Sequence, residues 1–330
     1  MSGDVVLIGI GVPISGSWAT PANQLRLVRR AEELGYHSAW TFQRLLVPER
    51  PGERAGIEAY RSVHDAIVPL AFVAGHTTRI RLGVSVLNIP FFSPALMAKQ
   101  LATLDAVCGG RLDVGLGIGW MREEYAAVGV PYRRRGRRAE EFLAALRALW
   151  TEEIVEFHGE FYEIPRSRME PKPVQRPHPP LILGGGARPA LERAGRLADG
   201  WAASSGADLH RIGEAIGVVR QAAAEAGRDP DTLRFICRGP LRVRPGGGGA
   251  GRLPLTGLLE EVRKDLDSLR DQGVTEVFLD MNYDPEIGSP DADPDQALHR
   301  AETALDALAP WPRRPSPSVA SRGRRGGLHR

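Results

Sequence analysis

The residues of this chain that could do chemistry lie where short apolar runs end in glycine or in polar residues. Two glycine-containing turns of this kind each lead into a stretch with a helical pattern. They are Gly117, Ile118, Gly119 and Trp120 in the first turn and Gly184, Gly185 and Gly186 in the second. Glycine lets a ligand approach the main chain, and the start of a helix offers backbone N–H groups to an anion. The two turns therefore predict a binding site for a phosphorylated ligand.

Two other apolar runs carry polar residues at or near their ends. These residues are Thr41, Gln43 and Arg44 for the first run, and Ser85 and Asn88, with Val86 between them, for the second. Ser85 stands inside an otherwise apolar stretch, where its hydroxyl needs a hydrogen-bond partner or a backbone irregularity. Because polar groups that directly follow a buried strand point into the mouth of a barrel, we expect these side chains to face a ligand.

Eight apolar runs alternate with helical patterns along the chain. The runs cover residues 5–11, 37–42, 79–87, 112–116, 180–183, 199–203, 233–243 and 274–281. A strand that is buried on both faces reads as a continuous apolar run, and eight strands each followed by a helix predict a (β/α)8 TIM barrel. A doubly wound sheet would need a GxGxxG motif after the first strand, and Pro13 and Ile14 do not complete the pattern that Gly9 and Gly11 begin.

Two segments do not fit the alternation. Residues 151–180 are rich in proline, glutamate and aromatic residues, and a long excursion of this kind predicts an inserted lid over the site. Residues 311–330 contain mainly arginine, serine, proline and glycine, which predicts a disordered basic tail after one domain over 1–310. A helix is expected over residues 59–74, and the crossover that follows the fourth strand is expected to be helical and interrupted near residues 129–131.

Composition argues against several classes of protein. Of the 43 lysines and arginines, six lie in the last eighteen residues, and removing them leaves 37 basic against 40 acidic side chains. The body is mildly acidic, so the net charge of +3 does not indicate a nucleic-acid partner. No apolar run approaches the roughly 20 residues of a membrane span. Cys108, Cys237 and eight scattered histidines form no metal-ligand motif, and with no basic signal segment we expect a cytoplasmic protein.

Longer motifs resemble the luciferase-like monooxygenase family. They are the block RLDVGLGIGWMREEYAAVGVPYRRRGRRAEEFLAALRALWTEE from Arg111, GEFY at 159–162, PKPVQRPHPPLILGGG at 171–186 and RAGRLADGW at 193–201. The stretch AEELGYHSAWTFQRLLVP resembles the actinobacterial branch that uses the deazaflavin coenzyme F420. The resemblance covers about residues 5–310 and implies a (β/α)8 barrel with an insertion, in which the ring of FMN or F420 lies in the barrel mouth.

The resemblance also implies roles for individual residues. The cis peptide bond that the family often carries in its third strand would be Ser85–Val86, and the family's phosphate loops would match residues 117–120 and 184–186. Gln43 and Arg44 stand where many relatives have an acid–histidine pair. Arginine stays protonated and cannot be a base, but it could stabilise negative charge on the reduced ring or on a substrate oxygen. Trp120 replaces the glutamate of sugar-phosphate dehydrogenases, which argues against such a substrate.

These observations predict an F420-dependent oxidoreductase that passes a hydride to a small organic substrate, with Arg44 and Gln43 as candidate catalytic residues. The coenzyme would be bound by residues listed above, namely Thr41, Ser85, Val86, Asn88, Gly117, Ile118, Gly119, Trp120, Gly184, Gly185 and Gly186. The alternatives are an FMN-dependent monooxygenase that uses O2 and a family member that binds the coenzyme without catalysis. The exposed helices of a barrel make a homodimer possible.

Overall fold

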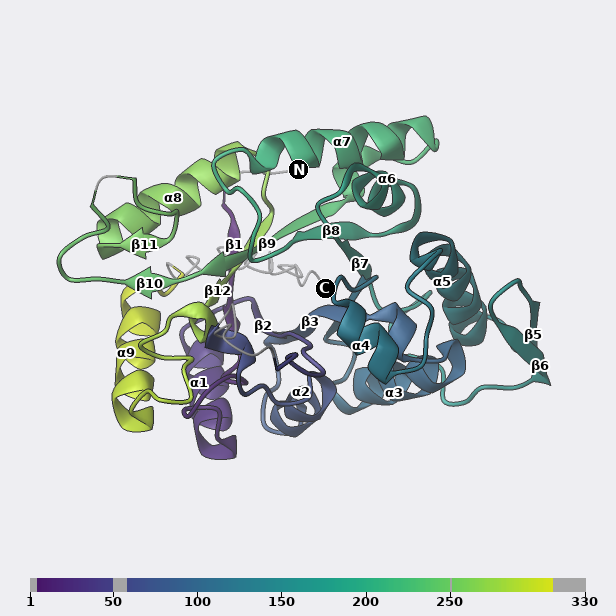
Figure 1. Ribbon diagram of the computed structural model, residues 1–330, viewed down its shortest axis with the longest axis horizontal. Helices are drawn as coiled ribbons and strands as arrows, with labels where there is room; N and C mark the ends of the chain where they lie inside the picture. Colours follow the sequence, from purple (N-terminus) through teal and green to yellow (C-terminus); the bar gives the residue numbers. More distant parts are fainter. Residues whose placement is uncertain (1–4, 50–57, 250, 311–330) are drawn as a thin grey trace, which may run out of the picture.

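The computed structural model describes residues 5–49, 58–249 and 251–310 and contains a closed barrel of eight parallel strands (Figure 1). In barrel order the strands are β1 (Leu7–Gly11), β12 (Glu276–Asp280), β9 (Arg234–Pro240), β8 (Gly200–Ala203), β7 (Leu181–Gly184), β4 (Leu112–Gly117), β3 (Arg81–Asn88) and β2 (Ser38–Thr41). Helices connect successive strands on the outside. The predicted (β/α)8 barrel is confirmed, and each strand lies within a few residues of its predicted position.

The lumen of the barrel is filled by side chains rather than open. Trp40, Ile182, Ala202, Ile236 and Phe278 form a buried cluster of their own, and the rings of Trp40 and Phe278 stack with centroids 5.3 Å apart. A filled interior leaves the two ends of the barrel as the places where a ligand can bind.

The connecting helices are α1 (Pro21–Glu33), α2 (Ile67–Ala74), α3 (Pro94–Val107), α4 (Arg122–Ala127), α5 (Arg135–Thr151), α6 (Arg188–Leu197), α7 (Ile212–Glu225), α8 (Leu259–Asp271) and α9 (Pro294–Ala307). The prediction of one helix over residues 59–74 is wrong. Glu58–Tyr60 forms a short 3-10 turn, and α2 begins only at Ile67. The Asp65 carboxylate accepts the backbone N–H of Ile67 at 2.7 Å and that of Val68 at 3.0 Å, which satisfies the first free donors of α2 and sets its start.

A network of charged side chains closes the amino end of the barrel. The buried carboxylate of Asp113 on β4 receives hydrogen bonds from Arg81 on β3 at 2.7 Å and from Arg234 on β9 at 2.6 Å. Arg234 also bonds the buried carboxylate of Glu276 on β12 at 2.9 Å. Strands β9 and β4 are separated by β8 and β7 in the barrel order, so the pair Arg234–Asp113 joins strands that are not neighbours.

The excursion over residues 151–180 contains an antiparallel hairpin, β5 (Val155–His158) and β6 (Glu163–Ser167). Its turn is held by Glu141 of α5, whose carboxylate accepts the backbone N–H groups of Phe161 and Tyr162 at 2.7 Å each. The hairpin lies beyond α5 at the outer edge of the molecule (Figure 1). None of residues 151–180 is among the described residues that line the cavity at the carboxyl ends of the strands, so the expected lid over the site stays a prediction.

The expected disordered tail at 311–330 falls outside the described residues. Within the part of the chain that the structure describes, no helix combines the length and the apolar character needed to cross a membrane, and no three His, Cys, Asp or Glu side chains gather as a set of metal ligands.

Candidate active site

The carboxyl ends of the strands surround a cavity of about 190 Å³, called the mouth cavity below. Its described lining is Phe42, Gln43, Arg44, Tyr60, Ser85, Val86, Asn88, Gly117, Ile118, Gly119, Trp120, Gly184, Gly185, Ala202, Ala203, Ser204, Ser205 and Arg238. The structure therefore brings together, from four different strand ends, all but two of the residues that the sequence analysis selected.

Thr41 and Gly186 are the two that lie elsewhere. The Thr41 side chain is buried, and its hydroxyl donates to the carbonyl oxygen of Ala66 at 2.8 Å, which ties β2 to the start of α2. Gly186 lines a separate hollow of about 480 Å³ that shares Ser204 with the mouth cavity. A second hollow, of about 490 Å³, shares Ser205 with it. Each hollow thus adjoins the mouth cavity at one shared residue.

Packing explains why glycine is needed at two of the positions that the sequence analysis assigned to phosphate binding. A Cβ atom on Gly117 would lie 2.5 Å from Cγ2 of Val86, and one on Gly184 would lie 2.9 Å from Cγ1 of the same valine. The two glycines therefore make room for the Val86 side chain, which stands between β4 and β7.

The helical crossover that follows Gly119 is interrupted where the sequence analysis expected, because α4 ends at Ala127 and α5 begins at Arg135. Helix α4 is six residues long and carries Glu123 and Glu124 in its first turn. These acidic groups occupy the positive end of the helix dipole, which makes this helix start less favourable for a phosphate. The start of α6, which follows the second glycine turn, carries no acidic residue in its first turn.

The Ser85–Val86 peptide bond is cis. The strand register between β3 and β4 shifts at this point, between Val84 and Leu87. The carbonyl oxygen of Ser85 accepts a hydrogen bond from Nη2 of Arg238 across the mouth. The bend of β3 is therefore anchored by a residue of β9.

Arg238 and Tyr60 line the mouth cavity and were both missed by the sequence analysis. Arg238 is buried, and its Nη1 donates to the hydroxyl of Tyr283 at 2.7 Å. Its Nε has no hydrogen-bond partner among the described residues, and the nearest carboxylate oxygen of Asp280 is 3.8 Å away. Burial raises the pKa of Asp280. The signal was present in the sequence, since an arginine inside an apolar strand must find partners.

Arg44 is the second buried guanidinium in the mouth. Its Nη1 lies 3.1 Å from the Glu124 carboxylate, and the two side chains are 6% and 1% exposed. Its guanidinium carbon lies 4.2 Å from the ring centre of Tyr60 and 5.1 Å from that of Trp120. Its Nε also has no partner among the described residues. Two buried N–H groups beside one cavity can each donate to a ligand oxygen.

Gln43 has a positioning role in this geometry. Its side-chain oxygen accepts the backbone N–H of Asn88 at 2.8 Å, which joins the end of β2 to the end of β3. A carboxamide has no dissociable proton near neutral pH, so the structure gives Gln43 no means of acid–base chemistry.

Comparison with known proteins identifies the chain. The family model for luciferase-like monooxygenases matches residues 4–246. The chain belongs to the luciferase-like monooxygenase family. Its members are oxidoreductases and monooxygenases, so the chain is an oxidoreductase rather than a non-catalytic binding protein.

Two relatives and one solved structure show what this chain is similar to. An uncharacterised protein of Mycobacterium tuberculosis is 35% identical over 236 residues, which are 72% of this chain and 74% of the relative. The FMNH(2)-dependent dimethylsulfone monooxygenase of Pseudomonas putida is 35% identical over 214 residues, 64% of this chain and 56% of that enzyme. The F420-dependent tetrahydromethanopterin reductase of Methanopyrus kandleri superposes with a TM-score of 0.72 over 92% of this chain and 98% of that one. At 17% identity it shows the shared fold alone.

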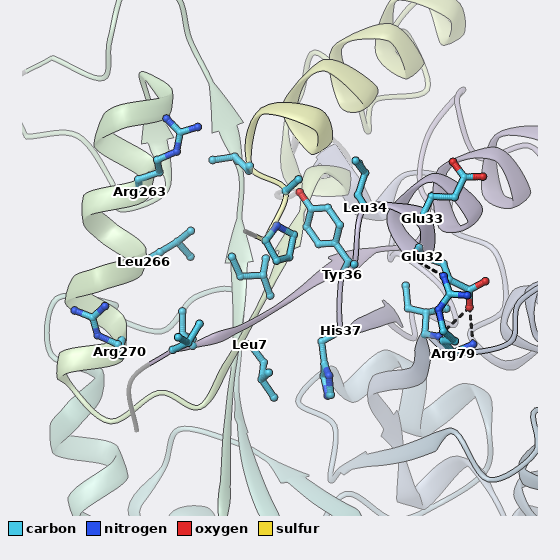
Figure 2. Close-up of a pocket in the computed structure, with 18 of the residues that line it drawn as sticks. Leu7, Glu32, Glu33, Leu34, Tyr36, His37, Arg79, Arg263, Leu266 and Arg270 are labelled. Atoms are coloured by element: carbon cyan, nitrogen blue, oxygen red, sulfur yellow. Dashed lines mark hydrogen bonds between the residues drawn. The ribbon is translucent and has the colours of Figure 1, made fainter. Parts of the chain in front are cut away.

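Another cavity of this luciferase-like protein, of about 1280 Å³, lies at the opposite end of the barrel (Figure 2). Figure 2 shows Tyr36 and His37 between α8, which carries Arg263, and the helix that carries Glu32. The polar groups there are already paired. Glu32 accepts the backbone N–H groups of residues 78–80, and Tyr36 donates to a carbonyl of α9 at 2.8 Å. Burial lowers the pKa of His37. Since the amino end of such barrels serves stability, we place the candidate chemistry at the mouth.

Proposed function

We propose that this protein is an F420-dependent oxidoreductase, in which the reduced deazaflavin lies in the mouth cavity and delivers two electrons and a proton to a small unsaturated or carbonyl substrate. The observation that carries the proposal is the mouth itself. The cis Ser85–Val86 segment, the Val86 side chain and two buried arginines surround one cavity at the carboxyl ends of the strands.

The residues present fit a flavin-type ring. Such a ring carries carbonyl oxygens along one edge, and these accept hydrogen bonds. Nε of Arg44 and Nε of Arg238 are buried and without partners among the described residues, so each can donate to such an oxygen. The mouth cavity is too small for the whole coenzyme, but the adjoining hollow beside Gly186 offers space for a phosphorylated arm.

The protein's own groups supply position and shielding. Val86 and the backbone of residues 85–86 would support the ring. The hydrogen bond that Ser85 accepts from Arg238 and the one that Asn88 donates to Gln43 hold β3 in place. Trp120 is 61% exposed at the rim, where it can cover a bound ligand. The cofactor carries the electron chemistry, while the protein positions it and excludes water.

An FMN-dependent monooxygenase that uses O2 is the second candidate. The observation in its favour is the 35% identity to an enzyme named as FMNH(2)-dependent. Both rings would rest on the same strand ends and would need the same donors, so the mouth alone accommodates either.

A binding titration separates the two candidates. Purified protein is titrated with F420 and, separately, with FMN, and binding is followed by quenching of the ligand's fluorescence. We expect a micromolar or lower dissociation constant for F420 and a clearly higher one for FMN. Tighter binding of FMN would favour the monooxygenase, and binding of neither at micromolar concentration would refute both.

A further inference from the structure

A chain of hydrogen bonds leads from the buried Arg238 to the surface of the mouth cavity. Nη1 of Arg238 lies 2.7 Å from the hydroxyl oxygen of Tyr283, and that hydroxyl lies 3.1 Å from the hydroxyl of Tyr60. Tyr60 lines the mouth cavity, whereas Tyr283 is buried and lines the adjoining hollow of about 490 Å³. The two phenols therefore stand at the junction of the two spaces.

The direction of this chain follows from the chemistry of its first member. A guanidinium has only donors, so the Tyr283 oxygen must accept from Arg238. In the structure the Tyr283 hydroxyl donates to the Tyr60 oxygen. The hydroxyl hydrogen of Tyr60 has no acceptor among the described residues, and it can therefore bond an atom inside the cavity that Tyr60 lines.

The composition of the lining strengthens this assignment. The described residues around the mouth cavity include no Asp, Glu, His, Cys or Lys. The arginines there cannot give up a proton, and a phenol does so far more readily than the hydroxyls of Ser85, Ser204 and Ser205. Tyr60 is therefore the group in the described lining that is suited to proton donation.

The surroundings of Tyr60 fix the position of its ring. The Arg44 guanidinium lies over the ring, with its carbon 4.2 Å from the ring centre. The ring is held by an edge-on contact with Tyr283, with centroids 5.9 Å apart, and by Phe42 at 6.1 Å. The hydroxyl is thus held in place before a ligand arrives.

From this geometry we infer that Tyr60 is the proton donor of the reaction and that the substrate is a carbonyl or α,β-unsaturated carbonyl compound, with its oxygen at the junction of the two cavities. This inference rests on the proposed function. In the reduction of an enone, the hydride that reduced F420 would supply when bound would form a C–H bond at the substrate's β-carbon. The C=C π pair would then form a double bond between the α-carbon and the carbonyl carbon, the C=O π pair would move to the oxygen, and the Tyr60 hydroxyl would give that oxygen its proton. The resulting enol rearranges to the saturated ketone, and the phenolate regains a proton from water.

The first test is the variant Tyr60→Phe, with reduced F420 and 2-cyclohexen-1-one as the probe. A positioned general acid contributes on the order of 10²–10⁴ to a rate, so we expect kcat to fall at least 100-fold while the dissociation constant of F420 changes less than threefold. The matched control is Tyr162→Phe, which removes a phenol hydroxyl from the β5–β6 hairpin and should leave both values unchanged. A Tyr60→Phe enzyme with a rate within threefold of the wild type would overturn the inference.

The second test needs no turnover. The carbonyl stretch of ¹³C-labelled 2-cyclohexen-1-one is recorded by infrared difference spectroscopy on the coenzyme-free protein and with oxidised F420. A hydrogen bond from Tyr60 lowers this frequency in the wild type, and we expect the lowering to be lost in Tyr60→Phe and weakened in Tyr283→Phe, which keeps the donor but removes its anchor. The same frequency in wild type and Tyr60→Phe would overturn the inference.

The two tests distinguish failure of this inference from failure of the proposed function. If F420 does not bind but the carbonyl shift depends on Tyr60, the proposed coenzyme is wrong and the assignment of Tyr60 as proton donor is supported. If F420 binds and the enone is reduced at a rate that does not depend on Tyr60, the proposed function is supported and the assignment of Tyr60 as proton donor is wrong. Should Tyr60→Phe fail to fold, as judged by circular dichroism, the expected partial losses in Tyr283→Phe decide the question.

Discussion

Arg238 connects the two halves of the candidate site. One side of its guanidinium fork bonds the carbonyl of Ser85, and the other bonds Tyr283, so a single side chain fixes both the bend in β3 and the phenol pair. Lysine cannot replace a buried arginine that makes both hydrogen bonds, because lysine has one compact ammonium group rather than a planar fork of donors.

The variant Arg238→Lys tests this role. It keeps the charge but cannot serve Ser85 and Tyr283 together. Because a hydrogen bond from a charged group contributes about 1.5–3 kcal/mol, we expect the dissociation constant of F420 to rise roughly 10- to 100-fold in a fluorescence titration. Arg300→Lys, at an exposed pair with Glu286, is the matched control and should stay within twofold of the wild type. Unchanged binding by Arg238→Lys would remove Arg238 from the site.

The ion pair of Arg44 and Glu124 is the second test at this scale. Both side chains are almost fully buried, and Glu124 also accepts the backbone N–H of Leu45 at 2.8 Å. Glu124→Gln leaves the guanidinium buried without its counter-charge, so we expect a loss of roughly 3 kcal/mol in the free energy of unfolding. The exposed pair Arg211–Glu214 supplies the control, since Glu214→Gln should cost less than about 1 kcal/mol.

Urea denaturation at pH 7 measures the free energy of unfolding of Glu124→Gln and of Glu214→Gln. Adding Arg44→Met to Glu124→Gln removes the unpaired charge, so the double variant should be more stable than Glu124→Gln alone. Equal losses for the buried and the exposed pair would show that Arg44 is not held by Glu124.

At the scale of elements, two glycines, one on β4 and one on β7, leave space for a side chain of β3. Val86 fills the space that Cβ atoms on Gly117 of β4 and Gly184 of β7 would otherwise occupy. The glycines at these two strand ends therefore serve the packing of the Val86 side chain.

Overpacking at this point should be measurable and reversible. Gly117→Ala places a methyl group 2.5 Å from a Val86 methyl, and we expect a loss of about 1–3 kcal/mol in urea denaturation. Gly186→Ala meets nothing within 4 Å and should cost less than about 0.5 kcal/mol. The double variant Gly117→Ala with Val86→Ala should recover part of the loss relative to Val86→Ala alone. If the two substitutions add without interaction, the packing argument fails.

The elements themselves were largely predictable from the sequence. Buried parallel strands read as apolar runs, and the run over 233–243 marked β9 (Arg234–Pro240) for that reason. The start of α2 was missed because the Asp65 side chain competes for backbone N–H groups, a local effect that a helical pattern does not reveal.

The site was predictable only in part. Placement of residues at one rim follows from closing the barrel, so the positions of Arg44 and Ser85 could be expected. The contact between Arg238 and Ser85 joins residues 153 positions apart and depends on the register of strands that are not neighbours. The Tyr60–Tyr283 pair is 223 positions apart and joins two short 3-10 turns, Glu58–Tyr60 and Met281–Tyr283, that only the closed barrel brings together. Residue types in one strand carry no information about such a pairing.

At the scale of the whole molecule, one end of the barrel is suited to binding a ligand and the other to holding the strands together. At the mouth, the Nε groups of two arginines have no hydrogen-bond partner among the described residues. The amino end of the barrel, called the floor below, instead contains a hydrogen-bonded network of charged side chains, namely Asp113, Glu276, Arg81 and Arg234. Because these bonds link β3, β4, β9 and β12, the floor holds the barrel closed while the mouth is left to bind a ligand.

The floor should make the stability of the protein depend on pH in the acid range. Burial opposes ionisation of Asp113, but the two guanidinium groups outweigh it and hold the pKa of that carboxyl below its usual value. An aspartate whose pKa is depressed by folding contributes stability above about pH 4, its ordinary value, and loses that contribution as the pH falls through the folded pKa. Asp113→Asn should therefore lower the free energy of unfolding at pH 7 by roughly 3 kcal/mol.

The variant should also lose part of the acid dependence. Urea denaturation between pH 7 and pH 2.5 should give a wild-type curve that falls below about pH 4 and an Asp113→Asn curve that falls less over the same range. Asp231→Asn, at an 81% exposed partner of Arg220, should follow the wild-type curve. Parallel curves for wild type and Asp113→Asn would mean that the floor does not hold this carboxyl ionised, and the closure of the barrel would then depend on its apolar lumen alone.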